Sequence, residues 1–411
     1  MQRLLLLALG GLLLAACGPA TATDPGAPLS TGTWRAVVRT QGIEVPFLVE
    51  VATPTDSTVQ LTLRNADERL VLDPAPLRGD SLTVPIDIFD AELRLRREGA
   101  TFVGTWVKPY APGYELPIYL TAADTSRFPL DPAKTPGSFG GRYATTFTHE
   151  DGHTSQAVGL FQQQGAQVTG TFLTKTGDYR YLAGIADGDS LRLSTFNGEW
   201  AYLFVAGKLP DGTLQGTYYT GKSGRKTFSA RLDSTAQLPD ANTLAYLKPG
   251  AGGLRFSFPG TAGDTVTYPS PAFAGKPVVV QIFGTWCPNC RDETVFLADW
   301  YRRNQARGVE VIALAFERNP APEYANARIE KMRQKLDVRY RFAVAGESTS
   351  EAASKALPML SSVLGFPTTI FIDKAGRVRK IHTGFSGPGT GEAYSQFVAE
   401  FTATMEQLLA E

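Results

Sequence analysis

The feature that most constrains the fold is an apolar stretch followed directly by two closely spaced cysteines. Residues 278–283 read Val-Val-Val-Gln-Ile-Phe, which is typical of a strand buried inside a parallel sheet. Gly284 and Thr285 interrupt this stretch, and Cys287-Pro-Asn-Cys290 follows at once. Beyond the cysteines, apolar side chains recur at helical spacing, which predicts a helix that ends near Gly308.

This order places the first cysteine at the beginning of the predicted helix. The free N–H groups and partial positive charge there favour a thiolate over a thiol. A cysteine pKa of about 8.5 falls to roughly 3.5–7.5 in such a motif, so we expect Cys287 to ionise near neutral pH. Cys290, one turn further on, is then placed to attack a mixed disulfide formed at Cys287.

Two other interpretations of the cysteine pair are weaker. A Cys-x-x-Cys motif can supply half of a zinc site, but the chain has no second pair and its three histidines are remote in sequence. A purely structural bridge that closes so short a loop would constrain the unfolded chain little. The strand, motif and helix in succession therefore favour redox chemistry.

Two separated motifs resemble the TlpA/ResA-like branch of the thioredoxin-fold oxidoreductases. The first is Gly284-Thr-Trp-Cys-Pro-Asn-Cys-Arg-Asp-Glu293, and the second is Gly365-Phe-Pro-Thr-Thr-Ile-Phe-Ile-Asp-Lys-Ala-Gly376. They occur in the family's order, and the resemblance runs from about Leu254 to the end of the chain. It implies an α/β thioredoxin-like fold whose cofactor is the redox-active disulfide itself, with no metal.

The resemblance also implies roles for residues around the cysteines. The matching proline of the family is cis and offers backbone groups to an incoming peptide, and we carry this role to Pro367, flanked by Phe366 and Thr368. Trp286 corresponds to an aromatic wall for the target disulfide, although core packing is an alternative.

Glu293 corresponds to a glutamate that tunes the ionisation of the cysteines. Burial would raise its pKa and let it take a proton from Cys290, whereas the alternative is an exposed first-turn glutamate. Ordinary thioredoxins carry a buried aspartate at the position of Gln281, and this departure makes Glu293 the better candidate for proton handling.

The first residues resemble a bacterial lipoprotein signal. Arg3 is followed by an apolar run, and Leu14-Ala-Ala-Cys17 resembles a lipobox, which implies lipidation at Cys17 and removal of residues 1–16. An ordinary signal peptide is the alternative. Either interpretation places the chain outside the cytoplasm, where disulfides persist, and the lipobox indicates the bacterial cell envelope, with a periplasm-facing chain.

Charge and length limit the kinds of partner and the number of domains. Lysine plus arginine number 40, as do aspartate plus glutamate, so the chain has no excess of positive charge that would indicate nucleic-acid binding. No second apolar run approaches the roughly 20 residues of a spanning helix, so we expect membrane contact through the lipid. A length of 411 residues predicts two or three domains.

Between Thr31 and Leu238 the sequence consists of short alternating stretches separated by turn residues, and it repeats itself. Gly32 and Gly141 begin similar tripeptides 109 residues apart, and a Gly-Asp-Ser-Leu motif recurs at the same offset, at Gly79 and Gly188. A further pair follows at an offset of 112, between Gly104 and Gly216. We predict a duplicated all-β region that forms an antiparallel barrel or sandwich. A metal site at His149 and His153 is less favoured than a hairpin turn there.

The fold class is therefore a multidomain chain, with an all-β duplicated region before an α/β thioredoxin-like fold. We expect residues 354–364 to be mostly helical. The expected divisions are a signal peptide (1–16), a flexible tether (17–30), β repeat 1 (31–126), β repeat 2 (136–236), a linker (237–252) and the thioredoxin-like domain (253–411).

The leading functional hypothesis is an envelope thiol-disulfide oxidoreductase that reduces disulfides of client proteins through Cys287 and Cys290. An electron-donating membrane or envelope thiol protein would restore the dithiol, and the β repeats would offer a surface to clients or partners. One alternative is a thioredoxin-fold peroxidase, which would need a Thr-x-x-Cys motif where Gly284 stands. Another is a binding lipoprotein in which the β repeats carry the main function.

Overall fold

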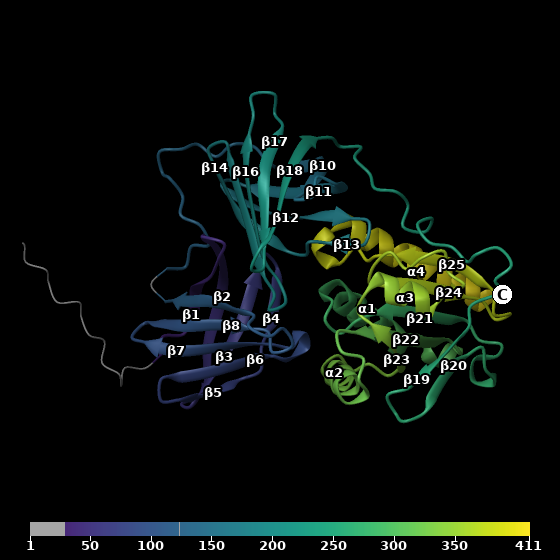
Figure 1. Cartoon of the computed structure of the whole chain (residues 1–411). Helices are drawn as coiled ribbons and strands as arrows, with labels where there is room; N and C mark the ends of the chain where they lie inside the picture. Colours follow the sequence, from purple (N-terminus) through teal and green to yellow (C-terminus); the bar gives the residue numbers. More distant parts are fainter. Residues whose placement is uncertain (1–28, 123) are drawn as a thin grey trace, which may run out of the picture.

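The computed structural model describes residues 29–122 and 124–411. The expected signal peptide (1–16), the lipidated Cys17 and almost all of the tether lie outside these residues. The described chain forms two β units and an α/β domain, and all three meet around one junction (Figure 1). None of the described helices combines the length and apolar character needed to span a bilayer.

The first β unit is a closed antiparallel sheet. Neighbouring strands follow one another along the chain, and pairing of the first strand with the last and of the second with the third closes the ring. The strands are β1 (Gly32–Thr40), β2 (Ile43–Thr55), β3 (Thr58–Asn65), β4 (Glu68–Val71), β5 (Ala75–Arg78), β6 (Ser81–Ile86), β7 (Ala91–Glu98), β8 (Thr101–Val107) and β9 (Glu115–Thr121), with β4 attached beside β3.

The second β unit repeats this topology strand for strand. Its order of neighbours is that of the first unit, and β13 flanks β12 as β4 flanks β3. The strands are β10 (Gly141–His149), β11 (Thr154–Gln164), β12 (Gln167–Thr174), β13 (Gly177–Asp178), β14 (Leu182–Asp187), β15 (Ser190–Phe196), β16 (Ala201–Lys208), β17 (Leu214–Thr220) and β18 (Gly224–Leu232). The duplication is confirmed, and of the two predicted architectures the barrel is the one observed. His149 and His153 flank the predicted hairpin turn between β10 and β11.

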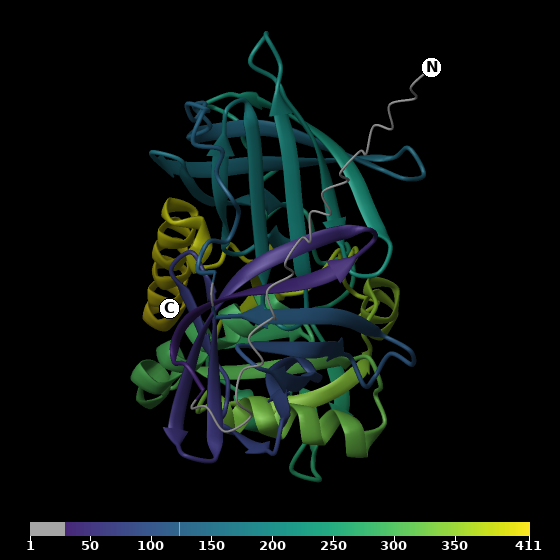
Figure 2. The same cartoon turned by 90° about the vertical axis from the view of Figure 1, so that its left-hand side faces the viewer.

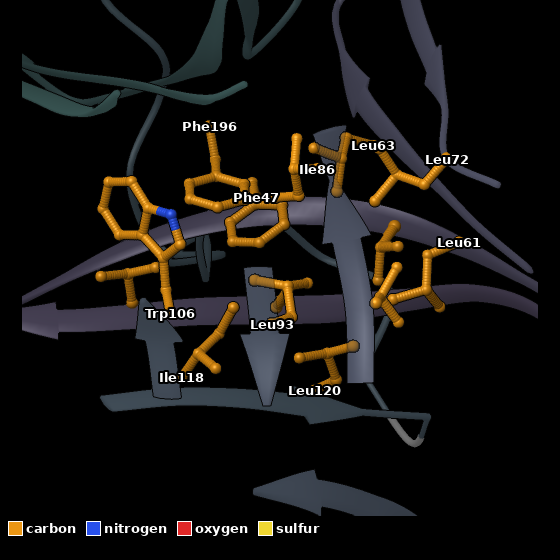
Figure 3. Packing of buried hydrophobic residues seen from close by; sticks show 14 of the residues in the cluster. Phe47, Leu61, Leu63, Leu72, Ile86, Leu93, Trp106, Ile118, Leu120 and Phe196 are labelled. Carbon is orange, nitrogen blue, oxygen red and sulfur yellow. The ribbon is translucent and has the colours of Figure 1, made fainter. Parts of the chain in front are cut away.

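The two closed sheets are joined through the interior of the first. Phe196, at the end of β15, stacks on Phe47 with ring centroids 4.4 Å apart and meets the edge of Trp106 at 5.0 Å (Figure 3). The side-chain amide of Asn65 donates to the Phe196 carbonyl oxygen at 2.8 Å, and the Phe196 N–H donates back to Asn65 at 3.2 Å. Because an apolar ring and its polar backbone are both satisfied across the junction, the two units pack as one body (Figure 2).

The C-terminal domain is built on a five-stranded mixed sheet in the order β23-β22-β21-β24-β25. Its strands are β21 (Val278–Phe283), β22 (Glu310–Glu317), β23 (Arg341–Glu347), β24 (Thr368–Ile372) and β25 (Val378–Thr383), preceded by the hairpin of β19 (Phe256–Pro259) and β20 (Thr265–Tyr268). The helices are α1 (Pro288–Asn304), α2 (Pro322–Lys335), α3 (Ser350–Ala356) and α4 (Glu392–Ala410). Helices α1, α2 and α4 cover one face, and α3 with the hairpin covers the other, which agrees with the predicted α/β fold.

Two details of the domain differ from or refine the expectation. Residues 354–364 are not mostly helical, because α3 ends at Ala356. Pro358 explains the early end, since proline has no N–H to donate and disfavours helical geometry in the residue before it. Residues 237–252 pack on the domain surface, where the Lys248 N–H donates to the Met359 carbonyl oxygen and the Ser361 N–H to that of Tyr246.

Candidate active site

The two cysteines lie where strand β21 passes into helix α1. Cys287 is the N-cap residue of α1, and the backbone N–H of Cys290 donates to the Cys287 sulfur at 3.2 Å. The two residues form a disulfide, with their Cα atoms 5.2 Å apart. Pro288 occupies the first turn, where a missing N–H costs nothing. A thiolate at Cys287 would therefore meet an N–H donor and the positive end of the helix dipole.

Only one of the cysteines is open to a partner. Cys287 retains 6% of its exposed surface and Cys290 retains none. The Cys287 sulfur is also 3.6 Å from the carbonyl oxygen of Phe366. Of these two sulfurs, only that of Cys287 is therefore within reach of an external group.

The loop before β24 faces the disulfide. The peptide bond between Phe366 and Pro367 is cis, as the resemblance implied. The Trp286 ring meets the Phe366 ring edge-on with centroids 5.7 Å apart, and its indole N–H donates to the Phe316 carbonyl oxygen. Trp286 and Phe366 border a cleft beside Cys287, whereas Thr368 is fully buried and pairs within the sheet.

Glu293 is completely buried, one helical turn beyond Cys290. Its carboxylate accepts hydrogen bonds from the Thr369 hydroxyl at 2.6 Å and from the Gln281 amide at 2.8 Å. Burial raises the pKa of Glu293 to about 7, against the opposing effect of these two donors. The exposed first-turn alternative is therefore excluded, and Gln281 serves this carboxylate as a hydrogen-bond donor.

A second buried acid, Glu317, was not anticipated from the sequence. It accepts from the Thr285 N–H at 2.8 Å and from the Thr285 hydroxyl at 2.7 Å, and burial raises its pKa. It ends strand β22, and no sequence pattern distinguishes it from an exposed strand-end glutamate. These contacts fix the position of Thr285, two residues before Cys287, and use its hydroxyl group.

The second closed sheet lies directly against the cysteine motif. The Asn289 side chain donates to the backbone oxygen of Asp178 at 3.2 Å, and the Gly387 N–H donates to the Asp178 carboxylate at 2.7 Å. Thr176 fills the space in which Gly365 and Gly384, on either side of the proline loop, would carry a side chain. We name residues 174–181 the covering segment; it comprises the β12–β13 turn and the residues that follow it.

Two networks of charged groups hold the three parts together beside this site. The Arg180 guanidinium pairs with Glu68 of the first sheet and Asp292 of α1, and it donates to the Pro288 carbonyl oxygen at 3.0 Å. The carboxylate of Glu199, which is 0% exposed, pairs with Lys108 of the first sheet at 3.0 Å and with Arg318 at 2.7 Å. Sequence reasoning missed these residues because each pair joins positions far apart in the chain.

The His149 and His153 rings stack 3.6 Å apart, and each hydrogen-bonds a residue of its own hairpin, Ser155 and Asp151. Within residues 29–122 and 124–411, no group of three or more histidine, cysteine or acidic side chains is arranged to hold a metal ion.

Comparison with known proteins places the cysteine site in a family. Residues 236–396 match the family described as Redoxin. A stretch of 112 residues is 30% identical to the thiol-disulfide oxidoreductase ResA of Geobacillus thermodenitrificans, covering 27% of this chain and 57% of the relative. The C-terminal domain has a thioredoxin-like fold and is similar to the TlpA/ResA-like oxidoreductases.

A second relative carries the same name. ResA of Bacillus thuringiensis is 26% identical to this chain over 130 residues, which are 32% of this chain and 66% of that protein. The chain thus spans roughly three fifths of the length of the curated relatives that it matches. A solved thiol:disulfide interchange protein from Chlorobium tepidum aligns at 20% identity and a TM-score of 0.30, over 38% of this chain and 94% of that one.

Proposed function

We propose that this chain is a thiol-disulfide oxidoreductase that reduces disulfides in client proteins. The observation that carries the proposal is the placement of Cys287 at the N-terminus of α1, 6% exposed, with Cys290 fully buried behind it and the cis Pro367 loop opposite. The similarity to relatives named as thiol-disulfide oxidoreductases supports the same activity.

The reaction proceeds through one mixed disulfide. The Cys287 thiolate attacks one sulfur of the client disulfide, and the other client sulfur leaves as a thiolate that takes up a proton. The Cys290 thiolate then attacks the Cys287 sulfur and releases the second client thiol. Two electrons have passed to the client, and Cys287 and Cys290 are joined as the disulfide. A thiol protein of the envelope supplies two electrons to restore the dithiol.

Glu293 is the candidate proton acceptor for Cys290. A carboxyl group with a pKa of about 7 exchanges protons readily at neutral pH. We propose that it takes the proton when the Cys290 thiol becomes the attacking thiolate. Trp286, Phe366 and the backbone at Pro367 hold the client segment while this exchange occurs.

Trapping of the mixed disulfide tests the proposal. In a Cys17→Ser background, Cys287 and Cys290 are the only cysteines of the chain. We expect reduced Cys290→Ser protein to accumulate a covalent adduct with a disulfide-containing peptide, seen by mass spectrometry, and Cys287→Ser protein to form none. Equal adducts in both variants, or none in either, would contradict the assignment.

We also propose that Cys17 carries the lipid anchor and that the chain faces the periplasm. The apolar run and lipobox-like residues 14–17 support this location. The matched experiment is fractionation of cells that express the natural chain or the Cys17→Ser variant. Membrane association that survives the substitution would contradict a lipid anchor at Cys17.

A further inference from the structure

The cleft beside Cys287 is walled on two sides by different domains. It has a volume of about 240 Å³, and the thioredoxin-like domain contributes Trp286, Phe366 and the cysteine motif to it. The opposite side comes from the second closed sheet. Its aromatic residues are Tyr179, Trp200, Tyr202 and Tyr218, and Thr174, Thr176, Gly177 and Asp178 complete it. Six aromatic side chains therefore surround the approach to the reactive sulfur.

Three of these aromatic residues form a compact cluster. The ring centroids of Tyr179, Tyr202 and Tyr218 are 5.3–5.4 Å apart in all three pairs. Trp200 stacks on Tyr202 at 6.0 Å with an interplanar angle of 18°. We name Tyr179, Trp200, Tyr202 and Tyr218 the aromatic wall.

The tyrosines distinguish the second repeat from the first. Ala91 pairs with Ile86 in the first sheet, and Tyr202 pairs with Thr195 at the matching position of the second. In the same way the first sheet holds Trp106 and Leu70 where the second holds Tyr218 and Tyr179. Only the second repeat carries this set of phenols, in which Tyr218 also belongs to the buried core of its own sheet and Tyr179 and Tyr202 pack against that core.

The four side chains of the aromatic wall carry no charge at neutral pH, and the Lys108 ammonium lies 4.7 Å from the centroid of the Trp200 ring. Burial raises the pKa of Tyr179 to about 12 and raises the pKa values of Tyr202 and Tyr218 well above their usual range. An uncharged aromatic surface with a few hydroxyl groups suits another aromatic side chain, since aromatic pairs gain roughly 0.5–1.5 kcal/mol beyond area burial.

The dimensions of the approach limit what can reach Cys287. The covering segment contacts the proline loop through Thr176 and the cysteine motif through Asp178. A broad protein surface therefore cannot dock over Cys287. The cleft is also smaller than the roughly 300–1,000 Å³ of ordinary ligand sites, and it fits one large side chain rather than a whole small molecule.

We propose that the aromatic wall is a substrate subsite, which selects disulfides carried on an extended peptide with an aromatic side chain next to the cysteine. This inference rests on the proposed function, because it names the substrate class of the same redox site. The peptide lies between the two domains, its cysteine meets Cys287, and its aromatic neighbour packs against Trp200 and the tyrosines.

The test uses the full chain with Cys17→Ser and two peptides that differ only in phenylalanine or alanine next to a glutathionylated cysteine. Reduced protein is mixed with each peptide, and the second-order rate constant is measured by acid quench and mass spectrometry. Hydroxyethyl disulfide serves as a small substrate without an aromatic group. We expect the phenylalanine peptide to react roughly 3–10 times faster than the alanine peptide.

Variants of the wall locate the preference. In Trp200→Leu we expect the ratio between the two peptides to fall to about 1, and the rate for hydroxyethyl disulfide, measured in the same variant, reports any change in the reactivity of Cys287 itself. Tyr202→Phe keeps the aromatic ring and removes only the hydroxyl group, so it should retain most of the preference. It serves as the control for a substitution in the wall that leaves the fold intact. Tyr246→Leu, which replaces an exposed aromatic residue outside the cleft, should behave as the natural chain.

The outcomes separate this inference from the proposed function. A ratio near 1 in the natural chain, or a preference that survives Trp200→Leu, would overturn the aromatic subsite while leaving the oxidoreductase intact. Failure to reduce hydroxyethyl disulfide as well as both peptides would overturn the proposed function and the subsite with it.

Discussion

At the scale of single residues, the site combines features that the sequence indicates with features that it does not. The place of the cysteine pair follows from the order of strand, motif and helix. The cis bond before Pro367 and the position of Trp286 beside the cysteines follow from the resemblance to the TlpA/ResA-like branch. The burial of Glu293 was open between two alternatives. Spacing along a helix shows which residues share a face, but not whether that face is buried. Here the face that carries Glu293 is buried because α1 lies against β21 and β24.

The buried carboxyl group of Glu293 predicts a specific pH dependence of stability. Its pKa rises from 4.5 to about 7 on folding, so the native state holds the proton more tightly than the unfolded chain does. Below pH 4.5 Glu293 is protonated in both states and its burial does not lower the free energy of unfolding through ionisation. As the pH rises, this free energy falls, and the loss reaches roughly 3 kcal/mol above pH 7.

We therefore expect Glu293→Gln to gain roughly 3 kcal/mol relative to the natural chain between pH 4.5 and 8. Urea unfolding at several pH values measures the difference, and Glu323→Gln, at an exposed position in the first turn of α2, is the control. A difference between Glu293→Gln and the natural chain that does not change with pH would contradict a buried, titrating Glu293.

At the scale of elements, the sequence predicted the duplication but not the closure of each sheet. Alternating strands joined by short turns suit a sandwich and a barrel equally well. Closure depends on β2 and β11, each of which pairs along its length with the strands before and after it. That double pairing is a long-range property with no local signature, and the same holds for the contact between the covering segment and the cysteine motif.

The repeat glycines provide a test of the sheet packing. A side chain at Gly104 would overlap the Arg94 carbonyl oxygen on the neighbouring strand β7, so we expect Gly104→Ala to destabilise the chain by roughly 1–3 kcal/mol. The control is Gly207→Ala in β16, where a methyl group meets nothing within 4 Å. A thermal unfolding midpoint that is equal in both variants would contradict the close strand approach at Gly104.

At the scale of the whole molecule, the β units and the redox domain pack against each other around the cysteine site. Arg180 and Glu199 each join side chains from all three parts, and both lie beside the cysteine motif. Removing one partner from a buried ion pair typically costs about 3–5 kcal/mol, because the remaining charges stay buried. The β region therefore forms part of the lining of the cleft beside Cys287.

We expect Arg180→Met to loosen the covering segment and open Cys287 to large reagents. In reduced Cys17→Ser protein, a polymer-linked maleimide should modify Cys287 several times faster in this variant, whereas small iodoacetamide should react at a similar rate in both. Arg231→Met removes a surface ion pair whose arginine is 71% exposed and serves as the control. Unchanged access for the large reagent would show that the Arg180 network does not hold the segment closed.

The reduction potential of the Cys287–Cys290 pair tests the central claim most directly. The Cys17→Ser chain is equilibrated against dithiothreitol and glutathione buffers, and the dithiol fraction is read by alkylation and mass spectrometry. If the protein reduces client disulfides, we expect a two-electron couple with a reduction potential near or below about −270 mV, at the thioredoxin end of the known range. A value near about −120 mV would identify a disulfide donor and contradict the proposed direction, and the absence of any two-electron couple would contradict the redox site itself.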